Sequence, residues 1–87
     1  MSEKNIASLA QESFKRKLKA LSESKTVEDA AFADAVYTAL SSFGVDERAF
    51  RTAFGLSAGA VERWTQLKNL PQPNIRPKII TWILQKL

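Results

Sequence analysis

Hydrophobic residues recur along this chain at intervals of three and four, the spacing that gathers side chains on one face of an α-helix. The pattern is clearest over residues 3–21, where polar residues fill the opposite face. The apolar members of this first stripe are Ile6, Leu9, Ala10, Phe14, Leu18 and Leu21. No segment shows the strict alternation that is typical of a half-buried strand. The pattern therefore predicts an all-α protein.

Turn and capping residues divide the pattern into five helices. The second helix is expected from a capping box at Thr26 and Asp29 to about Ser42, and Gly44 is well placed to end it. Its buried side is expected at Ala30, Ala33, Val36, Tyr37 and Leu40. The other helices are expected at residues 47–54 with Asp46 as cap, at residues 58–67 with Ser57 as cap, and from the cap Asn74 to Leu87 with Pro77 in the first turn.

The length of 87 residues and the 45% hydrophobic content fit one globular domain with a modest core. We expect a compact bundle of about five helices, in which residues 1–25 form an appended amphipathic helix and residues 26–87 the main compact domain. The chain has no apolar run long enough to span a membrane and no apolar signal segment at its start. A cytoplasmic protein without membrane contact is therefore the expectation.

The side chains offer little for catalysis. Cysteine and histidine are absent, which removes disulfides, the thiolate nucleophile, the commonest metal ligand and the commonest general base. The neighbouring acids Glu28 and Asp29 are most simply residues of a helix start. We therefore expect no enzyme activity, no metal site and no cofactor.

Charge is unevenly distributed over the chain, whose net charge is +4. Residues 25–47 carry one basic and five acidic side chains, whereas residues 48–87 carry seven basic side chains and only Glu62. A basic second half favours a polyanionic partner such as nucleic acid.

The most informative stretch joins two short predicted helices through a glycine. Phe50 and Phe54 anchor the first of them, and Gly55 follows at once, where a helix-turn-helix needs a residue tolerant of positive φ. In the second helix, Val61 and Trp64 lie three apart and are expected in the core. This arrangement leaves the outward face of the second helix free for a DNA groove.

This stretch resembles the phage-repressor helix-turn-helix family of the lambda-repressor-like or XRE type, and the resemblance covers about residues 30–87. The matching string is Phe50-x-x-x-Phe54-Gly55-Leu56-Ser57-x-x-x-Val61-x-x-Trp64, followed by Pro71 and a helix that begins near Arg76. The chain departs from the family pattern in having Arg51 for the usual alanine, Ala58-Gly59 at the start of the second helix, and Thr65-Gln66-Leu67 where Glu-x-Gly is common. The resemblance implies binding to double-stranded DNA in a bacterial or phage setting.

A recognition helix presents its outward residues to base edges in the major groove. The residues expected to do so are Ser57, Ala58, Gly59, Glu62, Arg63 and Gln66. Arg63 suits guanine and Gln66 suits adenine, while Glu62 could accept from cytosine or orient Arg63. Contacts to the DNA backbone are expected from Arg48, Thr52, Lys68 and Asn69, which flank this helix.

The last helix carries a wide apolar face, and Trp82 lies off it. One hypothesis is a homodimer interface that includes Ile79, Trp82 and Ile83, and the other is that Trp82 packs under the first helix within one chain. We expect a transcriptional repressor that occupies its operator as a dimer. The alternative is a protein-interaction module, such as an antitoxin-type helix-turn-helix protein, and the long first helix keeps this alternative open.

Overall fold

The computed structural model describes residues 2–87, with side chains from residue 9 onward, and confirms the all-α class. No strand occurs in this described part. The five helices are α1 (Ser2–Ser22), α2 (Asp29–Ser42), α3 (Glu47–Phe54), α4 (Ala60–Thr65) and α5 (Arg76–Gln85). None of the described helices combines the length and apolar character that a membrane crossing requires.

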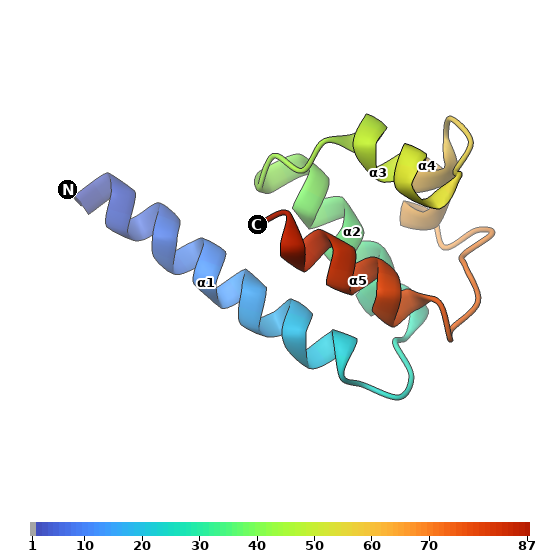
Figure 1. The fold of residues 1–87 in the computed structure, drawn as a ribbon, viewed down its shortest axis with the longest axis horizontal. Helices are drawn as coiled ribbons and strands as arrows, with labels where there is room; N and C mark the ends of the chain where they lie inside the picture. The colour runs from blue at the N-terminus through green and yellow to red at the C-terminus, as the bar shows by residue number, and fades with distance from the viewer. Residues whose placement is uncertain (1) are drawn as a thin grey trace.

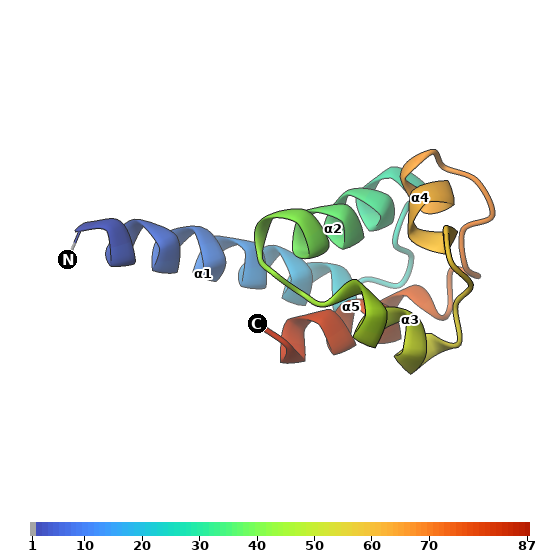
Figure 2. The same ribbon diagram turned by 90° about the horizontal axis from the view of Figure 1, so that it is seen from above.

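The helix α5 is the packing centre of the bundle, because it lies against both α1 and α2 (Figure 1). It runs antiparallel to α1, and the side-chain amide of Gln11 donates to the carbonyl oxygen of Leu87 at 2.8 Å. The helices α3 and α4 lie at the end of the molecule farthest from the N-terminus of α1 (Figures 1 and 2). The short elements are thus carried by a scaffold of three longer helices.

The first helix contributes to the common core through its C-terminal half. Phe14 is buried and Leu18 is 0% exposed, as their place in the hydrophobic stripe predicts. Leu9 and Ala10 were expected on the same buried stripe but are exposed, because α1 continues past the end of α5 at this point (Figure 1). The side chain of Ile6 lies outside the described residues.

Helix starts were predicted correctly only in part. Asp46 does cap α3, and its carboxylate accepts from the backbone N–H of Arg48 at 3.2 Å. The caps expected at Thr26 and Asn74 are wrong, since α2 follows Glu28 and α5 follows Ile75, neither with a side-chain cap. Pro77 does lie in the first turn of α5. Instead of side-chain caps, a buried arginine holds the loops that precede α2 and α5.

This arginine is Arg76, which is only 5% exposed. Its Nη1 donates to the carbonyl of Val27 and to the carboxylate of Asp29, both at 2.7 Å, and its Nε donates to the carbonyl of Pro71 at 3.0 Å. The guanidinium also lies over the ring of Phe32, 5.6 Å from its centroid. Arg76 therefore joins α5 to the loops before α2 and after α4, a role that the sequence pattern did not reveal.

The interface residues expected on α5 need correction. Ile79 and Ile83 are 2% and 0% exposed, because α5 packs against α1 and α2, so neither side chain is available to a second chain. Trp82 is half-buried and contacts Phe50 and Phe54 of α3, with ring centroids 5.6 and 5.8 Å apart. Its partner inside the chain is α3, whereas the hypothesis of packing within one chain placed it under the first helix.

Candidate nucleic-acid interface

The helices α3 and α4, with the turn between them, form a unit that we call the α3–α4 unit (residues 47–65). Gly55 ends α3 in the left-handed conformation, with φ of 63°, as expected. The N–H of Gly55 donates to Thr52 at 3.4 Å and that of Leu56 donates to Arg51 at 2.8 Å, the paired bonds of a Schellman stop. Glycine, which has no Cβ, suits this left-handed conformation, so the break between the helices could be predicted from the sequence.

The start of α4 differs from the expectation. The helix begins at Ala60 rather than Ala58, and Ser57 does not cap it. The reason is Gly59, which has φ of 86° and interrupts the right-handed helical conformation that residue 58 would have begun. The hydroxyl of Ser57 instead accepts a hydrogen bond from the guanidinium of Arg63 at 3.0 Å.

The end of α4 is also earlier than expected, at Thr65 rather than Leu67. Leu67 takes the left-handed conformation with φ of 60°. Its N–H donates to Trp64 at 2.9 Å and the N–H of Lys68 donates to Arg63 at 2.8 Å, so this end is a second Schellman stop. A leucine thus occupies a conformation for which glycine is the usual residue, at the place where the resembled family commonly has glycine.

Aromatic contacts fix the α3–α4 unit to the bundle. Trp64 is 4% exposed, as expected of a core residue, and its ring meets Phe50 edge-on at 6.1 Å and Phe32 of α2 at 5.3 Å. Its indole N–H donates to the carbonyl of Asn69 at 3.0 Å. Val61 is also buried, so the inward side of α4 is the predicted one.

The residues expected to read bases lie along the turn and α4. Six positions were expected, of which Ser57, Ala58, Glu62 and Gln66 are exposed and Gly59 and Arg63 are half-buried. Glu62 and Gln66 are four apart, one helical turn, on the side of the segment away from Val61 and Trp64. None of the six is enclosed by the protein core.

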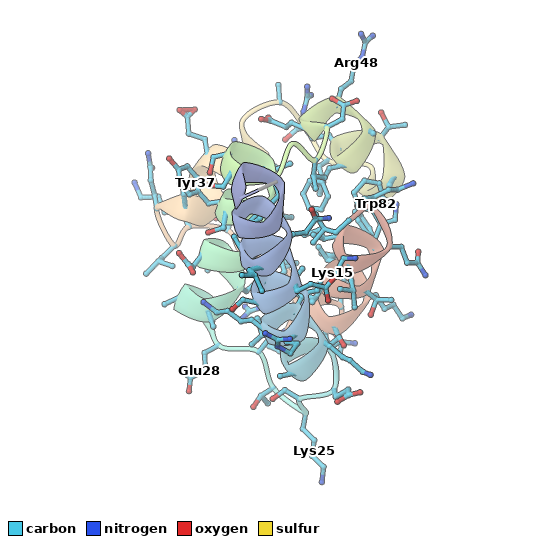
Figure 3. The ribbon with its side chains drawn as sticks, turned by 90° about the vertical axis from the view of Figure 1, so that its left-hand side faces the viewer. Lys15, Lys25, Glu28, Tyr37, Arg48 and Trp82 are labelled. Atoms are coloured by element: carbon cyan, nitrogen blue, oxygen red, sulfur yellow. The ribbon has the colours of Figure 1, made fainter. Side chains whose placement is uncertain are left out.

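The four residues expected to contact the DNA backbone are exposed as well. Arg48 and Thr52 lie one turn apart on α3, while Lys68 and Asn69 follow α4. Figure 3 shows Arg48 extended away from the body of the protein. Asn69 has a left-handed backbone conformation, with φ of 51°. The residue is exposed to solvent.

The positive charge near the α3–α4 unit is smaller than the sequence suggested. Of the seven basic residues in 48–87, Arg76 is buried in the core, and Lys78 and Lys86 belong to the segment of α5. The ammonium of Lys86 lies over the ring of Trp82, 5.0 Å from its centroid. The sequence could not show that Arg76 is buried, because a charge count carries no information on burial.

Arg51, which stands where the family that the sequence resembles usually has alanine, pairs with Glu47 one turn earlier, with 3.6 Å between Nε and Oε2. Its Nε is buried without a hydrogen-bond partner in the described structure. Among the described side chains, Arg48, Arg63 and Lys68 make no ion pair. They are the cations that this end of the molecule offers to an anionic ligand.

A second surface adjoins the unit between α2 and α4. Tyr37 was expected to be buried but is 56% exposed, because it lies at the rim of a hollow whose other wall includes Thr65 and Leu67. Ala30, expected on the same buried side, is exposed too, whereas Ala33 and Val36 are buried as expected.

Comparison of the chain with protein-family models, with curated proteins and with solved structures finds no match. The function is therefore inferred from the geometry of the α3–α4 unit.

Proposed function

We propose that the α3–α4 unit is a helix-turn-helix and that the protein binds double-stranded DNA as a transcriptional regulator. The observation that carries the proposal is the break at Gly55, after which the buried Trp64 anchors α4 and leaves Glu62 and Gln66 exposed. A short helix held in this way on a rigid body can enter the major groove with its polar side outward.

The proposed contacts divide into two classes. Arg63, Gln66 and Glu62 would meet base edges, where arginine recognises guanine and glutamine recognises adenine. Arg48 and Lys68, which are exposed and outside any intrachain ion pair in the described structure, would meet phosphates on either side of the groove. Occupation of an operator by such contacts would repress the neighbouring gene.

The experiment is a selection of duplexes from a random-sequence DNA library, followed by affinity measurement on the selected duplex at several salt concentrations. We expect affinity to fall steeply with salt, because each phosphate contact releases counterions. Arg48→Ala should weaken binding to all duplexes alike and reduce the salt slope by about one. Arg63→Ala should relax the preference at one base pair.

The matched control is Lys25→Ala, which removes the same charge from the opposite end of the molecule (Figure 3). Equal losses for Arg48→Ala and Lys25→Ala would refute a DNA surface at the α3–α4 unit. Failure to select any sequence, together with salt-independent binding, would refute DNA recognition as the function.

Dimerisation is a separate part of the proposal, and the buried Ile79 and Ile83 cannot supply its interface. Two bound copies would read half-sites about one helical turn apart. Measurement of molar mass on the selected duplex distinguishes one bound copy from two, and a single copy at saturation would refute the dimer.

The second candidate function is a protein-interaction module. The exposed Tyr37 and Leu67, at 56% and 52%, border the hollow between α2 and α4 and favour a protein partner there. An antitoxin-type protein would combine such a surface with DNA binding. Binding of DNA that is unchanged in the Tyr37→Ser variant would place the two activities on different surfaces.

A further inference from the structure

The side chain of Arg63 is hydrogen-bonded to the turn that precedes α4. Its Nη2 donates to the hydroxyl of Ser57 at 3.0 Å, across the turn that precedes α4. Its Nη1 lies 3.4 Å from the position that a Cβ on Gly59 would take. The backbone N–H of Arg63 also donates to the carbonyl of Gly59 at 3.0 Å. The guanidinium therefore folds back over the turn instead of extending freely into solvent.

No acidic side chain in the described part of the chain pairs with this guanidinium. The neighbouring Glu62 makes no ion pair with Arg63 at the distances of the described structure, although the sequence suggested that it could orient the arginine. Ser57 is exposed and does not cap α4, so its hydroxyl has no helix-capping role that would explain its contact. Among the described residues, the bond to Arg63 is the one hydrogen bond that the Ser57 side chain makes.

We propose that Ser57 is a positioning residue for Arg63 and thereby sets the base-pair specificity of the protein; this inference rests on the proposed DNA-binding function. A guanidinium carries five N–H donors, and the bond to Ser57 occupies one of them. A bidentate contact to O6 and N7 of guanine needs two. The donors required for a guanine contact thus remain free while the rotamer is already restricted, which lowers the entropy lost on binding.

Gly59 has a part in the same arrangement. Its φ of 86° disfavours residues that have a Cβ, and a Cβ here would lie in van der Waals contact with Nη1 of Arg63. The serine and the glycine, which were expected to meet base edges themselves, therefore both lie against the arginine. The partner that this geometry fits is a guanine in the major groove.

The test measures affinities of the wild type, Ser57→Ala, Arg63→Ala and the double variant for the selected duplex and for duplexes with each base pair changed. We expect Ser57→Ala to reduce discrimination roughly three- to tenfold at the one base pair that Arg63→Ala also affects. The salt slope should not change, because Ser57 is uncharged. Ser57→Thr retains the hydroxyl and should restore the discrimination.

In the double variant, discrimination should equal that of Arg63→Ala alone. A further loss would mean that Ser57 itself reads DNA and would overturn the positioning role. Unchanged discrimination in Ser57→Ala would overturn it as well.

A measurement without DNA separates this inference from the proposed function. The ¹⁵Nε heteronuclear NOE of Arg63 in the free protein should be higher than that of the exposed Arg48 and should fall to the Arg48 level in Ser57→Ala. Equal values for Arg63 and Arg48 in the wild type would refute the restraint even if DNA binding is found. Restraint of Arg63 without any DNA binding would refute the proposed function, and with it the role in base-pair specificity, but not the positioning of Arg63 by Ser57.

Discussion

At the residue scale, Leu67 and Arg76 hold positions that their residue types rarely occupy. Leu67 has φ of 60°, a left-handed conformation that costs an L-residue with a Cβ about 1–2 kcal/mol. Arg76 is 5% exposed yet carries a charge that contacts two backbone carbonyls and one carboxylate. The first residue stores strain, and the second stabilises the junction of three segments.

Leu67→Gly should stabilise the protein. Relief of the left-handed strain outweighs the greater flexibility of glycine in the unfolded chain, and the leucine side chain is already 52% exposed. We expect the free energy of unfolding to rise by about 0.5–1 kcal/mol in urea titration. Asn69→Gly is the matched control, because asparagine tolerates its φ of 51° and little strain is released there. A lower stability of Leu67→Gly would mean that its exposed side chain makes a contact worth more than the strain.

Arg76→Met should destabilise the protein by about 3 kcal/mol, because it leaves the carbonyls of Val27 and Pro71 without their donor. Arg76→Lys should not restore the loss, since one ammonium cannot reach all three acceptors. Asp29→Asn is the comparison: the carboxylate is 61% exposed, so its loss should cost less than about 1 kcal/mol. Equal effects of Arg76→Met and Asp29→Asn in thermal and urea unfolding would contradict the role of the backbone carbonyls.

At the element scale, both ends of the turn between α3 and α4 depend on backbone conformations rather than on side-chain contacts. A Cβ at Gly55 would meet nothing within 4 Å, so its requirement for glycine is conformational alone. The turn orients α4 for the proposed DNA contact, and its stability therefore bears on both fold and function.

Gly55→Ala should lower the free energy of unfolding by about 1 kcal/mol, because alanine is strained at φ of 63° while no packing is disturbed. Gly55→Asn should cost less, since asparagine accepts the left-handed region more readily. Urea unfolding of the three proteins gives the order. Equal costs for alanine and asparagine would indicate that the conformation is not the cause.

At the scale of the whole molecule, α1 is joined to the rest of the bundle by part of its length. Leu18 is 0% exposed in the core that α2 and α5 share, whereas Leu9 is 67% exposed where α1 projects beyond α5 (Figure 1). The boundary expected at residue 25 separates two segments that share one core.

Leu18→Ala should therefore cost about 2–5 kcal/mol and lower the stability of the whole protein in a single transition. Leu9→Ala should change stability by less than about 0.5 kcal/mol. Circular dichroism and tryptophan fluorescence, followed together during urea unfolding, check the result. Separate transitions for the two signals would show that α1 unfolds independently of the core around Trp64.

The sequence by itself determined the helical class, the approximate extents of the longer helices, the break at Gly55 and the burial of Trp64. These features follow from local rules, namely the spacing of apolar residues and the conformational preference of single residues, which need no knowledge of neighbours in space. Three of the residues expected to read bases, Glu62, Arg63 and Gln66, are exposed or half-buried for the same reason, since they lie on the side of this segment away from the apolar pair Val61 and Trp64.

Only the tertiary structure decided where α4 begins and ends and which residue orients Arg63. It also decided that Arg76 and Ile79 are buried and that Trp82 packs against α3. Each depends on a contact between residues that are apart in the chain or on a backbone conformation that the residue type does not specify, as when Leu67 is left-handed and Arg76 reaches a carbonyl 49 residues away. Periodicity describes one helix at a time, whereas burial and charge pairing arise between segments, so the sequence pattern could not supply them.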